Sequence, residues 1–160
     1  CFVNVEKTLM NEYIGFADEL LDIFKEHKIN IEQITTGIDS MCLVVQEKEF
    51  KDKSIHTGVA EAFRKEVNIE EFMEYVRNVL DVDSFQIRKN KALICIVGEG
   101  MRHTVGILSR VCGVLARNGI NIEIIDQGPS ERNIIVGIDC NSDKDNAKKA
   151  VNYIYQEFFK

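Results

Sequence analysis

The chain has 160 residues, a length that allows one domain or two small ones. Its formal net charge of −6 argues against a nucleic-acid partner, because neutralising phosphates requires a basic surface. No apolar run approaches the roughly 20 residues of a membrane-spanning helix, and we expect no secretory signal. Hydrophobic residues make up 45% and charged residues 29%, which is typical of a globular protein.

The first half of the chain predicts six elements in the order strand, helix, strand, strand, helix, strand. They are FVNVE (2–6), a helix over 15–27, INIEQIT (29–35), MCLVVQE (41–47), a helix from Ile69 to Leu80 capped by Asn68, and DSFQIR (83–88). Residues 47–67 are an insertion between the third strand and the second helix. Within it, HTGVAEAFRKEV (56–67) has the apolar spacing of a short amphipathic helix.

The second half predicts the same order as far as the second helix. Its elements are ALICIVG (92–98), a helix from Gly106 to Asn118, INIEIID (120–126), NIIVGID (133–139) and a final helix ending near Phe158. Alternation in the second strand assigns Ile120, Ile122 and Ile124 to one face. Ser142 and Asp143 are the predicted N-cap pair of the final helix, whose expected inward residues are Ala147, Ala150, Val151, Ile154 and Phe158.

The two halves repeat each other at an offset of 91 residues. GFADELLDIFKEHKINIEQITTG (15–37) aligns without a gap with GILSRVCGVLARNGINIEIIDQG (106–128). We therefore expect an α+β protein of two ferredoxin-like βαββαβ units, residues 1–90 and 91–160, each with helices on one face of an antiparallel sheet. The second unit lacks its own last strand. We expect sequence upstream of Cys1 to complete it, and the chain to be a piece of a longer protein.

The reactive residues of the chain form no recognisable catalytic or metal motif. The five cysteines include no CxxC pair, and Cys42, Cys95 and Cys112 lie within apolar patterns. We predict that they are small buried hydrophobes in a reducing cytoplasm, with a disulfide framework or metal site as the alternative. There is no GxxxxGK[ST] or GxSxG motif, and the GxG at Gly98 is weak evidence for a dinucleotide site. The chain is predicted to bind a ligand rather than to catalyse a reaction.

A glycine before each first helix indicates where a ligand would bind. Gly15 and Gly106 allow a tight turn that leaves helix N–H groups unpaired, and these groups suit a carboxylate. The turn after each INIE strand brings polar side chains to the same end of the sheet. A zwitterionic amino acid fits this arrangement. The alternative is that both glycines only shape a turn.

This pattern resembles the ACT domain, and more specifically the C-terminal regulatory region of aspartate kinases. INIEQITTG (29–37) carries the resemblance in the first unit, and IVGEGMRHTVGILSRVCGVLARNGINIEIIDQGPSERNI (96–134) carries it in the second. The resemblance covers nearly the whole chain except residues 47–67. Members of the family often have ITTS and QGSSE-NI where this chain has ITTG and QGPSERNI.

The resemblance implies a homodimer joined through its ACT units, with an end-product amino acid, lysine or threonine, bound to the first unit at the chain–chain interface. The implied effector-binding residues are Met10, Tyr13, Gly15, Phe16, Ala17, Ile31, Glu32, Thr36, Gly37 and Asp39. Gly37 replaces the usual serine, and Ile38 stands where lysine-binding members can have a glutamate, so Asp39 is a second candidate partner for lysine.

The resemblance also implies what the intact protein does. It would transfer the γ-phosphate of ATP to the β-carboxylate of aspartate in an N-terminal kinase domain, which would hold ATP and Mg. This chain itself would carry no catalytic residue, metal or cofactor. Two other functions stay open: a free-standing ACT-pair sensor acting through a protein partner, and an enzyme on a ferredoxin-like fold, which the lack of clustered titratable groups disfavours.

Overall fold

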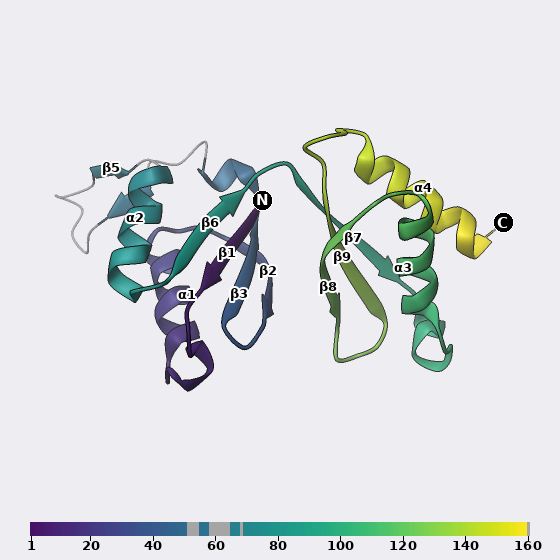
Figure 1. The fold of residues 1–160 in the computed structure, drawn as a ribbon, viewed down its shortest axis with the longest axis horizontal. Coiled ribbons are helices and arrows are strands. Elements are labelled where there is room, and N and C mark those ends of the chain that lie inside the picture. The colour runs from purple at the N-terminus through teal and green to yellow at the C-terminus, as the bar shows by residue number, and fades with distance from the viewer. Residues whose placement is uncertain (51–54, 58–64, 68, 160) are drawn as a thin grey trace. The chain divides into compact units, whose positions relative to one another are not determined.

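The computed structural model describes residues 1–50, 55–57, 65–67 and 69–159. The chain forms two compact units, Cys1–Lys89 and Asn90–Lys160, each with its own hydrophobic core (Figure 1). Each unit contains an antiparallel sheet and two helices longer than ten residues. The predicted tandem of ferredoxin-like units is confirmed.

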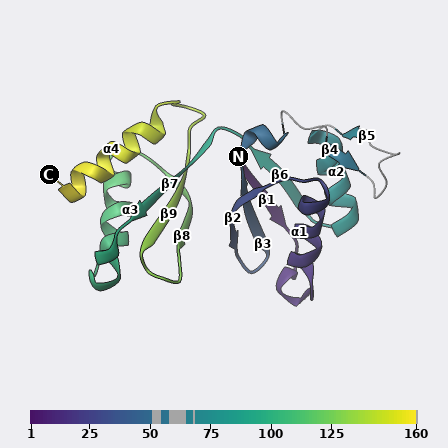
Figure 2. The same ribbon diagram turned by 180° about the vertical axis from the view of Figure 1, so that it is seen from behind.

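Unit 1 has a four-stranded sheet in the order β2-β3-β1-β6. All neighbouring strands are antiparallel, and both helices lie on one face of the sheet (Figures 1 and 2). The main elements are β1 (Phe2–Glu6), α1 (Phe16–Glu26), β2 (Ile31–Thr36), β3 (Ser40–Val45), α2 (Ile69–Leu80) and β6 (Ser84–Arg88). Two short 3-10 helices, η1 (Met10–Glu12) and η2 (Glu47–Phe50), follow β1 and β3.

Helical spacing of apolar residues explains how α1 and α2 cover this sheet. Phe16, Leu20, Ile23 and Phe24 are the buried residues of α1 and form one stripe along the helix. Phe72 of α2 is fully buried, and its ring makes edge contacts with Phe24 and Phe85 at centroid distances of 5.6 and 6.0 Å. Aromatic packing between the two helices and the sheet therefore forms the centre of the core.

Unit 2 has a three-stranded sheet in the order β7-β9-β8. Its main elements are β7 (Lys91–Val97), α3 (Ile107–Arg117), β8 (Ile122–Gln127), β9 (Asn133–Asp139) and α4 (Asn146–Phe159), with the 3-10 helix η4 (Glu99–His103) after β7. The described residues of this unit supply no fourth strand, as the element count predicts. The outer edge of β7 corresponds to the edge of β1 that β6 covers in unit 1.

A β-bulge in the INIEIID strand places Ile124 on a different face from the one predicted. Ile122 pairs with Ile138, but Ile124 pairs with Gly137, so Glu123 is the extra residue. The bulge shifts the alternation by one position. Ile120 and Ile122 pack on the helix-covered core, whereas Ile124 is buried outside that cluster. The prediction that all three isoleucines share a face is therefore wrong.

The insertion also differs from its prediction. Ile55–Thr57 (β4) and Lys65–Val67 (β5) are strands that pair antiparallel, so the two ends of the predicted 56–67 helix are extended. Residues 58–64 of that predicted helix, and the Asn68 cap, lie outside the described residues. Strand formation here depends on the cross-strand partner, and helical apolar spacing does not report such a partner.

Three smaller predictions are corrected in unit 2. The last helix begins at Asn146 rather than beside Ser142, because Asp143 Oδ1 accepts the N–H of Asp145 at 2.9 Å and forms a turn before the helix. Val151 is exposed rather than inward. Cys95 is exposed on β7, so it is not a buried hydrophobe, although the described structure has all five cysteines as free thiols.

Candidate functional site

The helix start of unit 1 has the conformation that the glycine predicts. Gly15 has φ 89° and precedes α1 without any side-chain cap, and Gly106 has φ 86° before α3. A Cβ at either glycine would meet nothing within 4 Å, so the constraint is the left-handed backbone and not space. The N–H of Phe16 donates to the Tyr13 carbonyl at 3.4 Å, and no described side chain caps the N–H groups that follow it in the first turn of α1.

Charge distinguishes the two helix starts. Asp18 and Glu19 lie in the first turn of α1, whereas the first turn of α3 has no acidic residue. Glu19 accepts a hydrogen bond from the Tyr13 hydroxyl at 3.1 Å, and this bond raises the pKa of Tyr13. The α1 start therefore favours a ligand that carries positive charge as well as a carboxylate.

The predicted residues around this helix start divide into core and surface. Met10 and Phe16 are buried, whereas Tyr13 and Ala17 are exposed. The Tyr13 ring contacts the edge of Phe16 at a centroid distance of 5.8 Å, and Lys7 Nζ lies 5.7 Å from the Tyr13 centroid. Met10 and Phe16 thus belong to the core beneath the loop that precedes α1, and the exposed ring of Tyr13 is an aromatic surface that a ligand can contact.

The β2–β3 turn lies at the same end of the sheet as the helix start (Figure 1). Thr36, Gly37 and Asp39 are all exposed there. The N–H of Gly37 donates to the Ser40 carbonyl at 2.7 Å, and a Cβ at Gly37 would lie 2.7 Å from Ser40 Oγ. A serine in place of Gly37 would therefore require Ser40 to move its hydroxyl.

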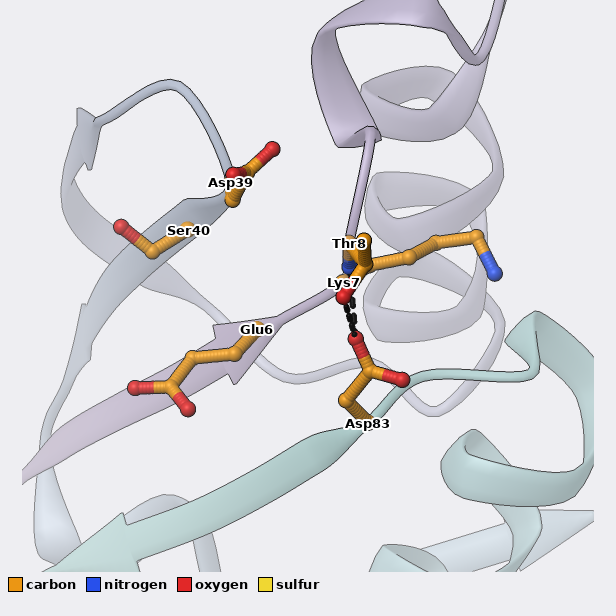
Figure 3. A pocket seen from close by; sticks show the side chains of 6 residues that line it. All are labelled: Glu6, Lys7, Thr8, Asp39, Ser40 and Asp83. Carbon is orange, nitrogen blue, oxygen red and sulfur yellow. Dashed lines mark hydrogen bonds between the residues drawn. The ribbon is translucent and has the colours of Figure 1, made fainter.

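An open cleft with a volume of about 460 Å³ lies between this turn and the end of β1. Glu6, Lys7, Thr8, Asp39, Ser40 and Asp83 line it (Figure 3). Asp83 Oδ2 accepts hydrogen bonds from Thr8 N at 2.6 Å and Thr8 Oγ1 at 2.8 Å, and these bonds lower the pKa of Asp83. Among the described residues, no hydrogen bond or ion pair engages the carboxylates of Glu6 and Asp39, which leaves both for a cation.

Ile31 and Glu32 lie away from this cleft within the same chain. They begin β2, close to the last turn of α1, and the 11 residues of α1 span about 16 Å. Glu32 is exposed, and its Oε1 accepts Gln46 Nε2 at 2.6 Å and Asn30 Nδ2 at 3.5 Å. One chain therefore brings together the helix-start and turn residues of the predicted site, but not Ile31 and Glu32.

The described residues offer no further inorganic or membrane site. No group of three or more His, Cys, Asp or Glu side chains among them is arranged to hold a metal ion. No helix in the described parts of the chain combines the length and apolar character needed to cross a bilayer.

Comparisons with known proteins agree with the fold of the two units. A family model described as the ACT domain matches residues 94–158. Aspartokinase 3 of Bacillus subtilis is 31% identical over 159 residues, which cover 99% of this chain and 31% of that protein. The crystal structure of aspartate kinase from Clostridium acetobutylicum is 30% identical with a TM-score of 0.80, covering 98% of this chain and 32% of the other. The chain is an ACT regulatory region of the aspartokinase family.

This aspartokinase region spans about a third of the length of the two full-length relatives. The regulatory subunit of aspartate kinase from Thermus flavus shares the fold at 21% identity and a TM-score of 0.71, covering 98% of this chain and 91% of that one. The ACT units described here therefore have the fold of a known regulatory subunit.

Five cleft residues of this aspartokinase region were not predicted from the sequence: Glu6, Lys7, Thr8, Ser40 and Asp83. They come from three separate segments, and the alignment of the two repeats does not mark them. The polar character of these positions is not repeated in unit 2, where Glu6 aligns with Val97 and Lys7 with Gly98. The only sequence feature that could have indicated these cleft residues is a run of polar residues directly after an apolar strand.

Proposed function

We propose that this chain is the effector-binding region of an aspartate kinase. The kinase part of the parent protein would use ATP and Mg to phosphorylate the β-carboxylate of aspartate, in the cytoplasm. The observation that carries the proposal is the match to aspartokinase 3 along 99% of this chain. The kinase would exist in two arrangements that bind the effector with different affinities. Effector binding would shift the population toward the arrangement that binds it more tightly, and the difference in affinity sets the size of this shift.

We propose lysine as the effector, with threonine as the main rival. Both have an α-carboxylate for the α1 start, but only lysine has a second ammonium. Burying an unpaired ammonium is costly, so a lysine site requires carboxylates around it. The end of unit 1 that carries the cleft supplies Glu6 and Asp39, and the first turn of α1 adds Asp18 and Glu19.

The complete site would form between two copies of the chain. β2 is an edge strand of its sheet, and its Ile34 side chain is 38% exposed on the edge. An unpaired edge is a template for another strand. Antiparallel pairing of two β2 edges would place Glu32 of one copy near Thr36 and Gly37 of the other. A homodimer of this kind would unite the two groups of predicted site residues.

Calorimetry of the chain with lysine, threonine and methionine in turn tests the effector. We expect saturable binding of lysine, weaker binding of threonine and none of methionine. Binding of threonine alone would show that the effector assignment is wrong. Light scattering at tens of micromolar tests the dimer, and a monomer both with and without lysine would contradict it.

The rival function, a free-standing ACT-pair sensor, makes a different prediction about the parent polypeptide. The Thermus flavus regulatory subunit, of which this chain covers 91%, shows that a chain of similar size can carry this fold. A kinase sequence in the same polypeptide would exclude the sensor. Its absence would instead predict co-purification with a separate catalytic subunit.

A further inference from the structure

The hydroxyl of Tyr13 joins the loop before α1 to the first turn of that helix. Tyr13 Oη donates to the Glu19 carboxylate, at 3.1 Å from Oε2 and 3.2 Å from Oε1. Because Tyr13 precedes Gly15, this bond draws the carboxylate back toward the helix start. The Tyr13 ring is itself held by its edge contact with buried Phe16. The Glu19 carboxylate is therefore held beside the end of α1 where a ligand carboxylate is proposed to bind.

The described part of the chain does not neutralise the charge of this carboxylate. Glu19 forms no ion pair with a described residue, and its hydrogen-bond donor is a neutral phenol. Lys7 Nζ, which lies over the Tyr13 ring, donates to the Asp81 carbonyl instead. A carboxylate can accept about four hydrogen bonds, so Glu19 keeps capacity for a further donor. The N–H groups of Ala17 and Asp18 in the same turn have no described acceptor. One helical turn thus offers both an anion and N–H donors, which match the ammonium and the carboxylate of an α-amino acid.

Unit 2 shows that the fold does not require this contact. At the offset of 91 residues, the counterparts of Tyr13 and Glu19 are Thr104 and Arg110. Thr104 Oγ1 donates to a backbone carbonyl of η4 at 2.8 Å, and the Arg110 guanidinium lies 4.2 Å from the ring centroid of Phe158. α3 nevertheless begins after a glycine with the same left-handed conformation. The contact between Tyr13 and Glu19 is therefore not needed to start the helix.

From this geometry we infer that Glu19 binds the α-ammonium of the effector and that Tyr13 positions the Glu19 carboxylate for it. The ligand carboxylate accepts hydrogen bonds from the N–H groups of the first turn of α1, and the α-ammonium donates to Glu19. Unit 2 has the cation of Arg110 at this position, which repels an α-ammonium. The inference rests on the proposed function, which places the effector carboxylate at the α1 start.

A ligand that lacks only the α-ammonium separates this role from a structural one. 6-Aminohexanoate keeps the carboxylate and the distal ammonium of L-lysine. Glu19→Gln keeps an oxygen that can accept the Tyr13 hydroxyl but loses the charge. It should weaken the binding of L-lysine and L-threonine about tenfold or more, and hardly change that of 6-aminohexanoate. Tyr13→Phe keeps the charge of Glu19 and should weaken lysine binding by a smaller factor. Glu74→Gln removes an exposed acid of α2 and is the matched control.

Calorimetry measures the amino acids directly and 6-aminohexanoate by displacement of bound lysine, and circular dichroism shows whether each variant folds. An unchanged lysine affinity in Glu19→Gln overturns the inference. Equal losses for lysine and 6-aminohexanoate also overturn it, because they would indicate a structural role alone. If Glu19→Gln does not fold, Tyr13→Phe decides by the same comparison of ligands.

The same titrations separate this inference from the proposed function. If the wild type binds threonine but not lysine, the effector assignment is wrong. The role of Glu19 is then decided by threonine and 3-hydroxybutyrate, which lacks only the α-ammonium of threonine. If the wild type binds none of the amino acids, both the proposed effector function and the role of Glu19 are wrong.

Discussion

Asp83 accepts two hydrogen bonds from one residue, Thr8, which precedes it by 75 positions. Its Oδ2 lies 2.6 Å from Thr8 N and 2.8 Å from Thr8 Oγ1 (Figure 3). The pair joins the loop after β1 to the residue before β6, and both residues line the cleft. This contact holds the wall of the cleft on which the predicted effector site depends.

Removing this contact should lower the stability of unit 1. Asp83→Ala removes both bonds and should lower the melting temperature by several degrees, and Thr8→Val, which keeps the backbone N–H, should have about half that effect. Glu74→Ala removes an exposed acid in the middle of α2 and is the control. Thermal unfolding followed by circular dichroism measures all three, and equal melting temperatures for Asp83→Ala and Glu74→Ala would contradict the assigned role.

Acid should weaken the fold through the same carboxylate. The bonds from Thr8 lower the pKa of Asp83, and the bond from Lys149 lowers that of Asp143, both from a usual value of 3.8. A lowered folded-state pKa gives stability that is present above the usual value and is lost as the pH falls through the folded value. The urea concentration at the unfolding midpoint should therefore decrease as the pH is lowered below about 4.

Asp83→Asn provides the control for this pH dependence. It cannot titrate at position 83, so its urea midpoint should change less than that of the wild type between pH 5 and pH 3. If the variant and the wild type lose stability in parallel across this range, Asp83 does not contribute to the acid transition.

Glycine should be required at the start of α1 for conformational reasons alone. Gly15→Ala forces a residue with a Cβ into the left-handed region, at a cost of about 1–2 kcal/mol. Gly106→Ala should cost a similar amount. A Cβ added at Gly100 would also meet nothing within 4 Å, but Gly100 lacks a positive φ, so Gly100→Ala should be nearly neutral. Chemical denaturation compares the three, and equal losses at Gly15 and Gly100 would rule out the conformational argument.

Phe72 should be among the most sensitive positions of unit 1. It is fully buried, and its ring contacts Phe24, His27, Phe50 and Phe85. Phe72→Ala should cost about 3–5 kcal/mol because it leaves a large cavity. Phe159→Ala makes the same change at a side chain that is 73% exposed and should cost far less. Denaturant unfolding of both variants measures the difference.

Glu32 should distinguish lysine from threonine. A hydrogen bond to a charged group contributes about 1.5–3 kcal/mol, so Glu32→Gln should weaken lysine binding about tenfold or more. Threonine has no distal ammonium, and its affinity should hardly change. Calorimetry with both ligands provides the measurement. An unchanged lysine affinity in the variant would remove Glu32 from the effector site.

Much of the fold follows from local sequence patterns. The order of elements in each unit is confirmed because apolar residues at helical or alternating spacing bury one face of a helix or strand wherever they occur. The repeat of residues 15–37 at 106–128 predicts the pair of glycine-opened helices, and both glycines have a positive φ. Counting elements also predicts that unit 2 contains three strands of its own, as the structure shows for the described residues.

Tertiary structure decides the arrangements that depend on pairing. The bulges at Glu32 and Glu123 arise from strand register, which the alternation of INIE does not reveal, and they change which face Ile124 occupies. The cleft joins the end of β1, the β2–β3 turn and Asp83, three segments that only the folded sheet brings together. The same INIE sequence meets Gln46 in one unit and Lys91 in the other, because the neighbours of a side chain come from other strands.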